Sequence, residues 1–304
     1  MALSLPPQLR PLAVMTAREL APHQQSVSIP RMEWIDICFN LTHESFNKER
    51  AEVLERAREA GVSWMLITGA DAHQSEKCLE IADQYPDCCR ATLGVHPHLA
   101  RQWTDAIAAR FSDLARADEN VVAMGEMGLD YNRDHSPRPQ QRIAFEAQLE
   151  LAADLGLPVF LHERDAHHDF AQILRRWRDK LPATVVHCFT GEADALAEYL
   201  DLDCHIGITG WVCDERRGTH LHPLVPRIPR GRLMIETDAP YLLPRTLPKG
   251  SGKKIGNGRR NEPAFLPHIG EYLAQLRDET PEDLAAHTTA TARAFYNLPE
   301  TADA

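Results

Sequence analysis

Four residues with metal-ligand chemistry stand at the ends of short apolar runs. Glu126 follows VVAMG, His162 ends PVFLH, His187 ends TVVH, and Asp238 comes two residues after LMIE. Imidazole nitrogens and carboxylate oxygens are ligands that a divalent ion uses to activate water near neutral pH. A single histidine of this kind is more often a hydrogen-bonded core residue, but four such residues at matching positions predict one site. We therefore expect all four to bind metal, with Asp238 and Glu126 as the catalytic carboxylates.

The apolar runs also predict the elements that position these residues. Uninterrupted Val, Ile and Leu stretches are typical of parallel strands buried on both faces. They predict strands at 34–39, 63–68, 91–95, 121–125, 158–162, 184–187, 205–208 and 233–236. Segments with helical periodicity lie between the strands, and Gly61 and Gly156 are expected to end two of these helices.

Eight strand–helix alternations predict the α/β class and a single (β/α)8 TIM barrel over residues 32–304. Such a barrel keeps its active site at the carboxyl ends of its strands, where the four candidate ligands would converge. A doubly wound open sheet is the alternative. It would normally have a glycine-rich phosphate loop after the first strand, and CFNLTHESF contains no glycine.

The composition limits the class of protein. Hydrophobic residues make up 43% of the chain, and the formal net charge is −11, which argues against broad nonspecific binding to duplex nucleic acid. The seven cysteines form no C-x2-C pair, so we expect a reduced, cytoplasmic protein. No apolar run approaches the ~18 residues of a membrane span.

Several sequence motifs around the predicted strand ends are specific enough to indicate a family. These are GVHPH at 94–98, GEMGLDY at 125–131, HERDA at 162–166, HCFTG at 187–191, GITGWVCDERRG at 207–218, ETDAPYLLP at 236–244 and RRNEPAFLPHI at 259–269. Together they resemble the TatD family of metal-dependent nucleases, from about residue 32 to the end of the chain. The resemblance implies an amidohydrolase-like barrel that hydrolyses phosphodiesters, with Glu126, His162 and His187 as metal ligands and Asp238 as the carboxylate facing the attacking water.

The resemblance also implies a substrate and an ion. Its closest branch trims single-stranded DNA, and perhaps RNA, from the 3′ end with Mg²⁺; Mn²⁺ and Zn²⁺ are alternatives, and DNA repair or degradation is the expected role. Most relatives carry H-x-H on the first strand, where this chain has Cys38 and Asn40. Asn40 still offers a carbonyl oxygen, but a thiol suits magnesium poorly. We therefore do not expect a tightly held pair of ions. A monomer is expected.

Cationic and aromatic side chains near the predicted strand ends are candidate contacts to substrate. The loop 245–260 carries six Lys and Arg residues and no acidic residue, which predicts attraction of phosphate. Aromatic rings after strands can stack on unpaired bases. The resulting candidates for substrate binding are His96, His98, Tyr131, Arg164, Trp211, Arg259 and Arg260.

Two other functions use the same residues differently. A hydrolase of small amides or esters, similar to D-aminoacyl deacylases, would keep the metal ligands but would not need the basic loop 245–260. A binding module without catalysis would be expected to lack some of the four candidate ligands, and all four are present.

The first 31 residues are expected to be a disordered extension that the barrel does not need. They contain five prolines and no sustained periodicity, and Met32 stands directly before the first predicted strand. A chain that starts at Met32 should therefore keep the melting temperature and the hydrolytic rate of the full chain. Calorimetry and a nuclease assay on both proteins check this, and a clear loss of either property would show that the extension contributes to the barrel.

Overall fold

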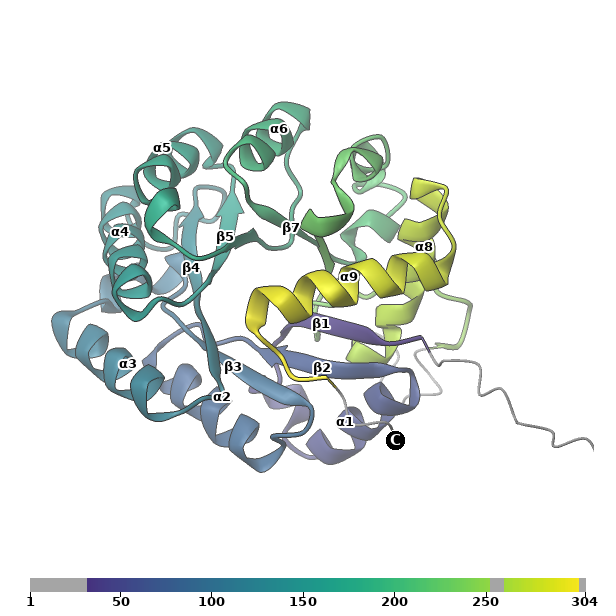
Figure 1. The fold of residues 1–304 in the computed structure, drawn as a ribbon, viewed down its shortest axis with the longest axis horizontal. Coiled ribbons are helices and arrows are strands. Elements are labelled where there is room, and N and C mark those ends of the chain that lie inside the picture. Colours follow the sequence, from purple (N-terminus) through teal and green to yellow (C-terminus); the bar gives the residue numbers. More distant parts are fainter. Residues whose placement is uncertain (1–31, 252–259, 301–304) are drawn as a thin grey trace, which may run out of the picture. The chain divides into compact units, whose positions relative to one another are not determined.

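Eight parallel strands form one sheet in sequence order in the computed structural model, which describes residues 32–251 and 260–300 (Figure 1). The strands are β1 Trp34–Phe39, β2 Val62–Ile67, β3 Cys89–Leu93, β4 Val121–Asp130, β5 Val159–Arg164, β6 Thr184–Val186, β7 His205–Ile208 and β8 Leu233–Ile235. A parallel bridge from Phe39 to Ala239, just beyond β8, joins the two ends of the sheet. The predicted barrel is confirmed. The predicted extension 1–31 and Arg259 lie outside the described residues.

Helices follow most of the strands and cover the outside of the barrel. They are α1 Arg50–Glu59, α2 Ala72–Gln84, α3 Asp105–Ala117, α4 Arg138–Leu155, α5 His167–Trp177, α6 Ala193–Asp201, α8 Leu266–Arg277 and α9 Pro281–Tyr296. Gly61 and Gly156 adopt positive φ angles of 91° and 66° directly after α1 and α4, as expected for residues that end helices. In the described part of the chain, no helix is both long and apolar enough to cross a membrane.

The connection from β7 to β8 departs from the expected strand–helix alternation. It contains four short 3-10 helices, Gly210–Cys213, Thr219–Leu221, Val225–Arg227 and Arg230–Arg232, in place of an α-helix. Pro223, Pro226 and Pro229 recur every third residue here. A proline inside an α-helix lacks the N–H that the helix needs and clashes with the preceding turn, so only single short turns form.

The core has two parts, one inside the barrel and one between the strands and the outer helices. The interior cluster includes Ile35, Phe160 and Met234, and it continues into Phe295 and Tyr296 of α9. Figure 1 shows α9, in yellow, lying across the barrel beside β1. The last helix therefore covers one end of the barrel interior. The candidate ligands lie at the other end, at the carboxyl ends of the strands.

The packing of α8 against β1 gives a stability test. A Cβ atom at Gly270 would lie 2.3 Å from Cη2 of Trp34, a side chain that is fully buried. Gly270→Ala should therefore lower the free energy of unfolding by about 1–3 kcal/mol, because the indole ring must move. Urea unfolding measures the change. Gly231→Ala is the matched control, since a Cβ there meets no atom within 4 Å; equal stability of the two variants would contradict the packing argument.

Candidate metal centre

One carboxylate oxygen lies at the centre of the site. Oε1 of Glu126 is 2.9 Å from Nδ1 of His162, 2.9 Å from Nε2 of His187 and 3.2 Å from Nε2 of His96. Burial by itself raises the pKa of Glu126. The neighbouring His96 and His187 and the hydrogen bonds from His162 and His187 outweigh burial and hold this pKa well below its usual range. The carboxylate is therefore ionised at neutral pH and draws three imidazoles together.

An irregular stretch of β4 places Glu126 in this position. The pairing of β4 with β5 shifts in register between Met124 and Met127, so Glu126 sits where the ladder is interrupted. Such bulges re-aim side chains and are common beside active sites. The prediction that the strand ends before Glu126 is wrong, because β4 continues to Asp130. The longer strand brings a second carboxylate to the same edge of the barrel.

Asp130 connects two of the histidines. Its Oδ2 lies 2.6 Å from Nε2 of His98 and 3.4 Å from Nε2 of His162. Burial raises the pKa of Asp130, but the hydrogen bonds from His162 and His98 outweigh burial and lower it. His162 thus lies between Asp130 and Glu126, and these two carboxylates raise its pKa although burial opposes the charge. Asp130 was not among the residues predicted from the sequence.

Asp238 reaches the site from the loop after β8. Asn40 Nδ2 donates to its Oδ1 at 2.9 Å, and Sγ of Cys38 lies 3.6 Å from the same oxygen. The two residues at the H-x-H positions thus hold the carboxylate, with Asn40 acting as a donor. Burial, together with the charges of Glu126 and Glu236, raises the pKa of Asp238 to about 7 although His187 opposes the shift. This carboxylate can take up a proton near neutral pH.

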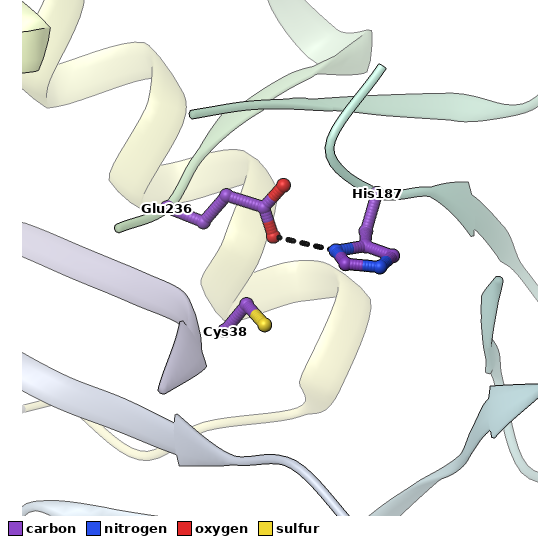
Figure 2. A group of neighbouring side chains, drawn as sticks. All are labelled: Cys38, His187 and Glu236. Atoms are coloured by element: carbon purple, nitrogen blue, oxygen red, sulfur yellow. Dashed lines mark ion pairs between the residues drawn. The ribbon is translucent and has the colours of Figure 1, made fainter. Parts of the chain in front are cut away.

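Glu236 contacts Nδ1 of His187, as Figure 2 shows, whereas Glu126 contacts Nε2 of the same ring. Its Oε2 lies 3.4 Å from Nδ1 of His187, and its Oε1 accepts a hydrogen bond from the backbone N–H of Cys188 at 2.5 Å. The side chain is fully buried, and a Cβ at Gly207 would lie 2.9 Å from Oε1, so glycine there makes room for the carboxylate. Sequence reasoning treated Glu236 as the last residue of a strand. Its place in the ETD motif was the available signal.

The donor atoms at this edge fit a divalent ion. His96, Glu126 and His162 form one group of ligand atoms within 4.8 Å of one another, and Cys38, His187 and Glu236 form a second. Oδ2 of Asp130 lies 3.4 Å from Nε2 of His162, and Oε2 of Glu236 lies 3.4 Å from Nδ1 of His187, so the other nitrogen of each ring, which faces Glu126, is the candidate ligand atom. The first group offers the nitrogen and oxygen donors that Mg²⁺, Mn²⁺ and Zn²⁺ share, whereas the thiol makes the second softer.

The predicted substrate contacts do not all lie at the centre. Arg164 donates to Oγ1 of Thr190 at 2.7 Å, and its guanidinium lies 5.0 Å from the ring centroid of Trp211. The guanidinium of Arg217 lies 4.3 Å from the same centroid. Arg164 and Trp211 thus form one cationic and aromatic group, from β5 and the segment after β7. The hydroxyl of Tyr131 instead donates to Asp169 of α5 at 2.7 Å.

Arg260 has a structural environment. The side chain is nearly buried, and its guanidinium contacts Glu262 at 2.5 Å and Glu49 at 2.9 Å and lies 4.6 Å from the ring centroid of Phe46. Arg245 is likewise paired, with Glu215 at 2.9 Å. These contacts already balance both charges, so the basic character of 245–260 is weaker than the sequence predicted.

Comparison with known proteins identifies the family of the chain. Residues 35–297 match the family of TatD related DNases. The chain is 52% identical over 263 residues to the 3′-5′ ssDNA/RNA exonuclease TatD of Rahnella sp. (strain Y9602). This match covers 86% of this chain and 98% of that protein. It is 53% identical to the exonuclease of the same name from Yersinia pseudotuberculosis serotype O:3 (strain YPIII), over 86% of this chain and 99% of that protein.

A solved structure has a similar fold. The TatD homologue YJJV of Escherichia coli K12 superposes with a TM-score of 0.79 at 27% identity, over 88% of this chain and 99% of the other. The motifs, the barrel and the convergence of three imidazoles on Glu126 lead to the same conclusion as these matches. The chain belongs to the family of TatD related DNases.

Proposed function

We propose that this protein is a divalent-metal-dependent exonuclease that hydrolyses single-stranded DNA or RNA from the 3′ end. The observation that carries the proposal is the contact of three imidazoles with one oxygen of Glu126 in a chain of this family. The names of its relatives support the substrate class and the polarity. We further propose that it acts as a monomer in the cytoplasm, in DNA repair or degradation; its seven free cysteines support a reducing compartment.

The metal would be held by Glu126, His162 and His187, with His96 as a further ligand in place of the phosphate contact expected from the sequence. Bound there, a divalent ion supplies a Lewis acid for the phosphate and lowers the pKa of water. Mg²⁺ is the proposed ion. Three imidazoles beside one carboxylate are softer than the oxygen ligands that Mg²⁺ prefers, which keeps Mn²⁺ and Zn²⁺ as alternatives.

The surrounding residues have roles that follow from their contacts. Asp238 is proposed to accept the proton of the attacking water, because its Oδ1 is held by Asn40 and fixes the direction of the carboxylate. Glu236 lies against Nδ1 of His187 and favours the tautomer whose Nε2 faces Glu126. Asp130 orients His162 and His98 in the same way.

Arg164 and Trp211 are the proposed contacts to the strand. A guanidinium pairs with phosphate, and an indole ring stacks on an unpaired base. His98 contacts Asp130 and is kept as a candidate phosphate contact. Tyr131 and Arg260 are not carried forward, because their polar atoms already bind Asp169, Glu49 and Glu262.

Removing a metal ligand should abolish hydrolysis without unfolding the protein. Glu126→Gln, His162→Ala and His187→Ala should each lower kcat by more than about 100-fold, since even residues that only orient ligands affect metal sites by 10–100-fold. Digestion of end-labelled single strands with Mg²⁺, Mn²⁺, Zn²⁺ or EDTA measures this, and calorimetric titration measures metal binding. His73→Ala, an exposed histidine on α2, is the control. Full activity of the variants, or hydrolysis of small amides or esters in preference to nucleic acid, would contradict the proposal.

Two arginines should separate substrate binding from stability. Arg164→Ala should weaken strand binding and reduce the slope of log K against log salt by about 0.7, the value for one phosphate contact on a single strand. Arg260→Ala should leave that slope unchanged but lower the free energy of unfolding by about 1.5–3 kcal/mol, because its hydrogen bonds go to charged groups. Fluorescence anisotropy over a salt series and urea unfolding give both quantities. A stable Arg260→Ala protein with a reduced slope would restore Arg260 as a phosphate contact.

A further inference from the structure

An exposed aromatic side chain follows Asp238 in the loop after β8. Among the described residues, the exposed large hydrophobic side chains are Tyr241, at 53%, and Ile143, at 61%. Ile143 lies on α4, which covers the outside of the barrel. Tyr241 lies three residues after Asp238. A large ring left in solvent beside a catalytic carboxylate is a candidate for binding rather than packing.

The backbone that leads to Tyr241 is anchored by hydrogen bonds. Its N–H donates to the carbonyl of Asp238 at 3.0 Å, and the carbonyl of Pro240 accepts from the N–H of Asn261 at 3.1 Å. The N–H of Asp238 in turn donates to the carbonyl of Cys38 in β1 at 3.0 Å. The ring is therefore exposed but carried by a fixed segment, which lowers the entropy lost when it binds a partner.

A second ring stands beside it. The rings of His43 and Tyr241 are 5.8 Å apart between centroids and nearly perpendicular, at 83°. Nδ1 of His43 lies 2.9 Å from Oγ of Ser45 and accepts from the N–H of Ser45, so this imidazole is also held in place. The two rings come from the loops after β1 and β8, the same two loops that supply Asn40 and Asp238.

The carboxylates of the site affect the titration of Tyr241. Partial burial raises the pKa of Tyr241, and the charges of Asp238 and Glu126 raise it further. The hydroxyl is thus neutral at pH 7, and its ring adds no repulsion toward a phosphodiester.

We propose that Tyr241, supported by His43, is a stacking platform for the unpaired base of the nucleotide beside the scissile phosphate. The inference rests on the proposed function and deepens it by naming how the strand is recognised. Every base has a π-face, so the platform accepts any sequence, but it requires a base that has left its duplex partner. Stacking on an aromatic side chain changes affinity by about 5- to 100-fold per base.

Abasic substrates test the platform directly. Single strands carrying one abasic site at each of the last three 3′ positions are compared with the intact strand, using anisotropy with chelator for Kd and steady-state digestion for KM and kcat. At one of the three positions, the one whose base stacks on Tyr241, the abasic strand should bind to the wild-type protein about 5- to 100-fold more weakly than the intact strand does. Tyr241→Ala should bind the intact strand that weakly too, and should lose no further affinity when the base is removed.

Three controls complete the experiment. Tyr241→Phe should behave as the wild type, because the ring and not the hydroxyl stacks. Ile143→Ala removes the other exposed side chain and should change nothing. Tyr241→Ala should also keep the wild-type salt slope, since no phosphate contact is lost.

The outcomes distinguish the two proposals. If wild-type protein binds and trims single strands but Tyr241→Ala discriminates against the abasic site as strongly as wild type, the platform is wrong and the nuclease proposal stands. If wild-type protein neither binds nor trims any single strand, the proposed function itself fails.

Discussion

The site depends on one buried carboxylate. Transferring Glu126 from water to the barrel mouth is unfavourable unless its charge is balanced. His162 and His187, whose pKa values are raised, supply that balance, and His96, whose pKa burial lowers to about 4, contacts the same oxygen as a neutral ring. The three imidazoles come from the ends of β3, β5 and β6, so each strand must hold its register for the oxygen to be contacted. The parallel barrel fixes those registers through its backbone ladder, and for this reason an ordinary fold positions an unusual concentration of charge.

Much of the fold was predictable because buried strands have a simple signature. The runs 34–39 and 205–208 coincide with β1 and β7, and every predicted strand overlaps an observed one. The errors have local causes. A register shift beside Met124 carries β4 on to Asp130, and a bulge depends on the neighbouring strand rather than on its own sequence. Three regularly spaced prolines exclude a helix between β7 and β8, a signal that was present in the sequence but was not used.

The candidate site, like the fold, was predictable only in part. Glu126, His162 and His187 could be chosen by residue type and position, and the structure brings them together. Glu236 was marked only by the ETD motif, because its importance comes from a contact to a residue 49 positions away. The ion pairs of Arg260 could not be predicted for a related reason: a count of charges along a loop shows their sign but not their partners, and Glu49 lies far away in the sequence. The sequence therefore indicates which side chains gather at the strand ends, but not the ion pairs between distant segments.

The position of α9 has a consequence for the order in which the chain can be completed. Phe295 and Tyr296 complete the interior cluster that begins with Ile35 in β1. A chain emerging from the ribosome therefore releases its first strand long before the residues that cover it, and the bridge from Phe39 to Ala239 also waits for late synthesis. At 5–20 residues per second, the roughly 260 residues between Ile35 and Phe295 take about 13–50 s to synthesise. During that interval the apolar face of β1 has no native cover from the last helix, and this nascent stage is where we expect the protein to need chaperone protection.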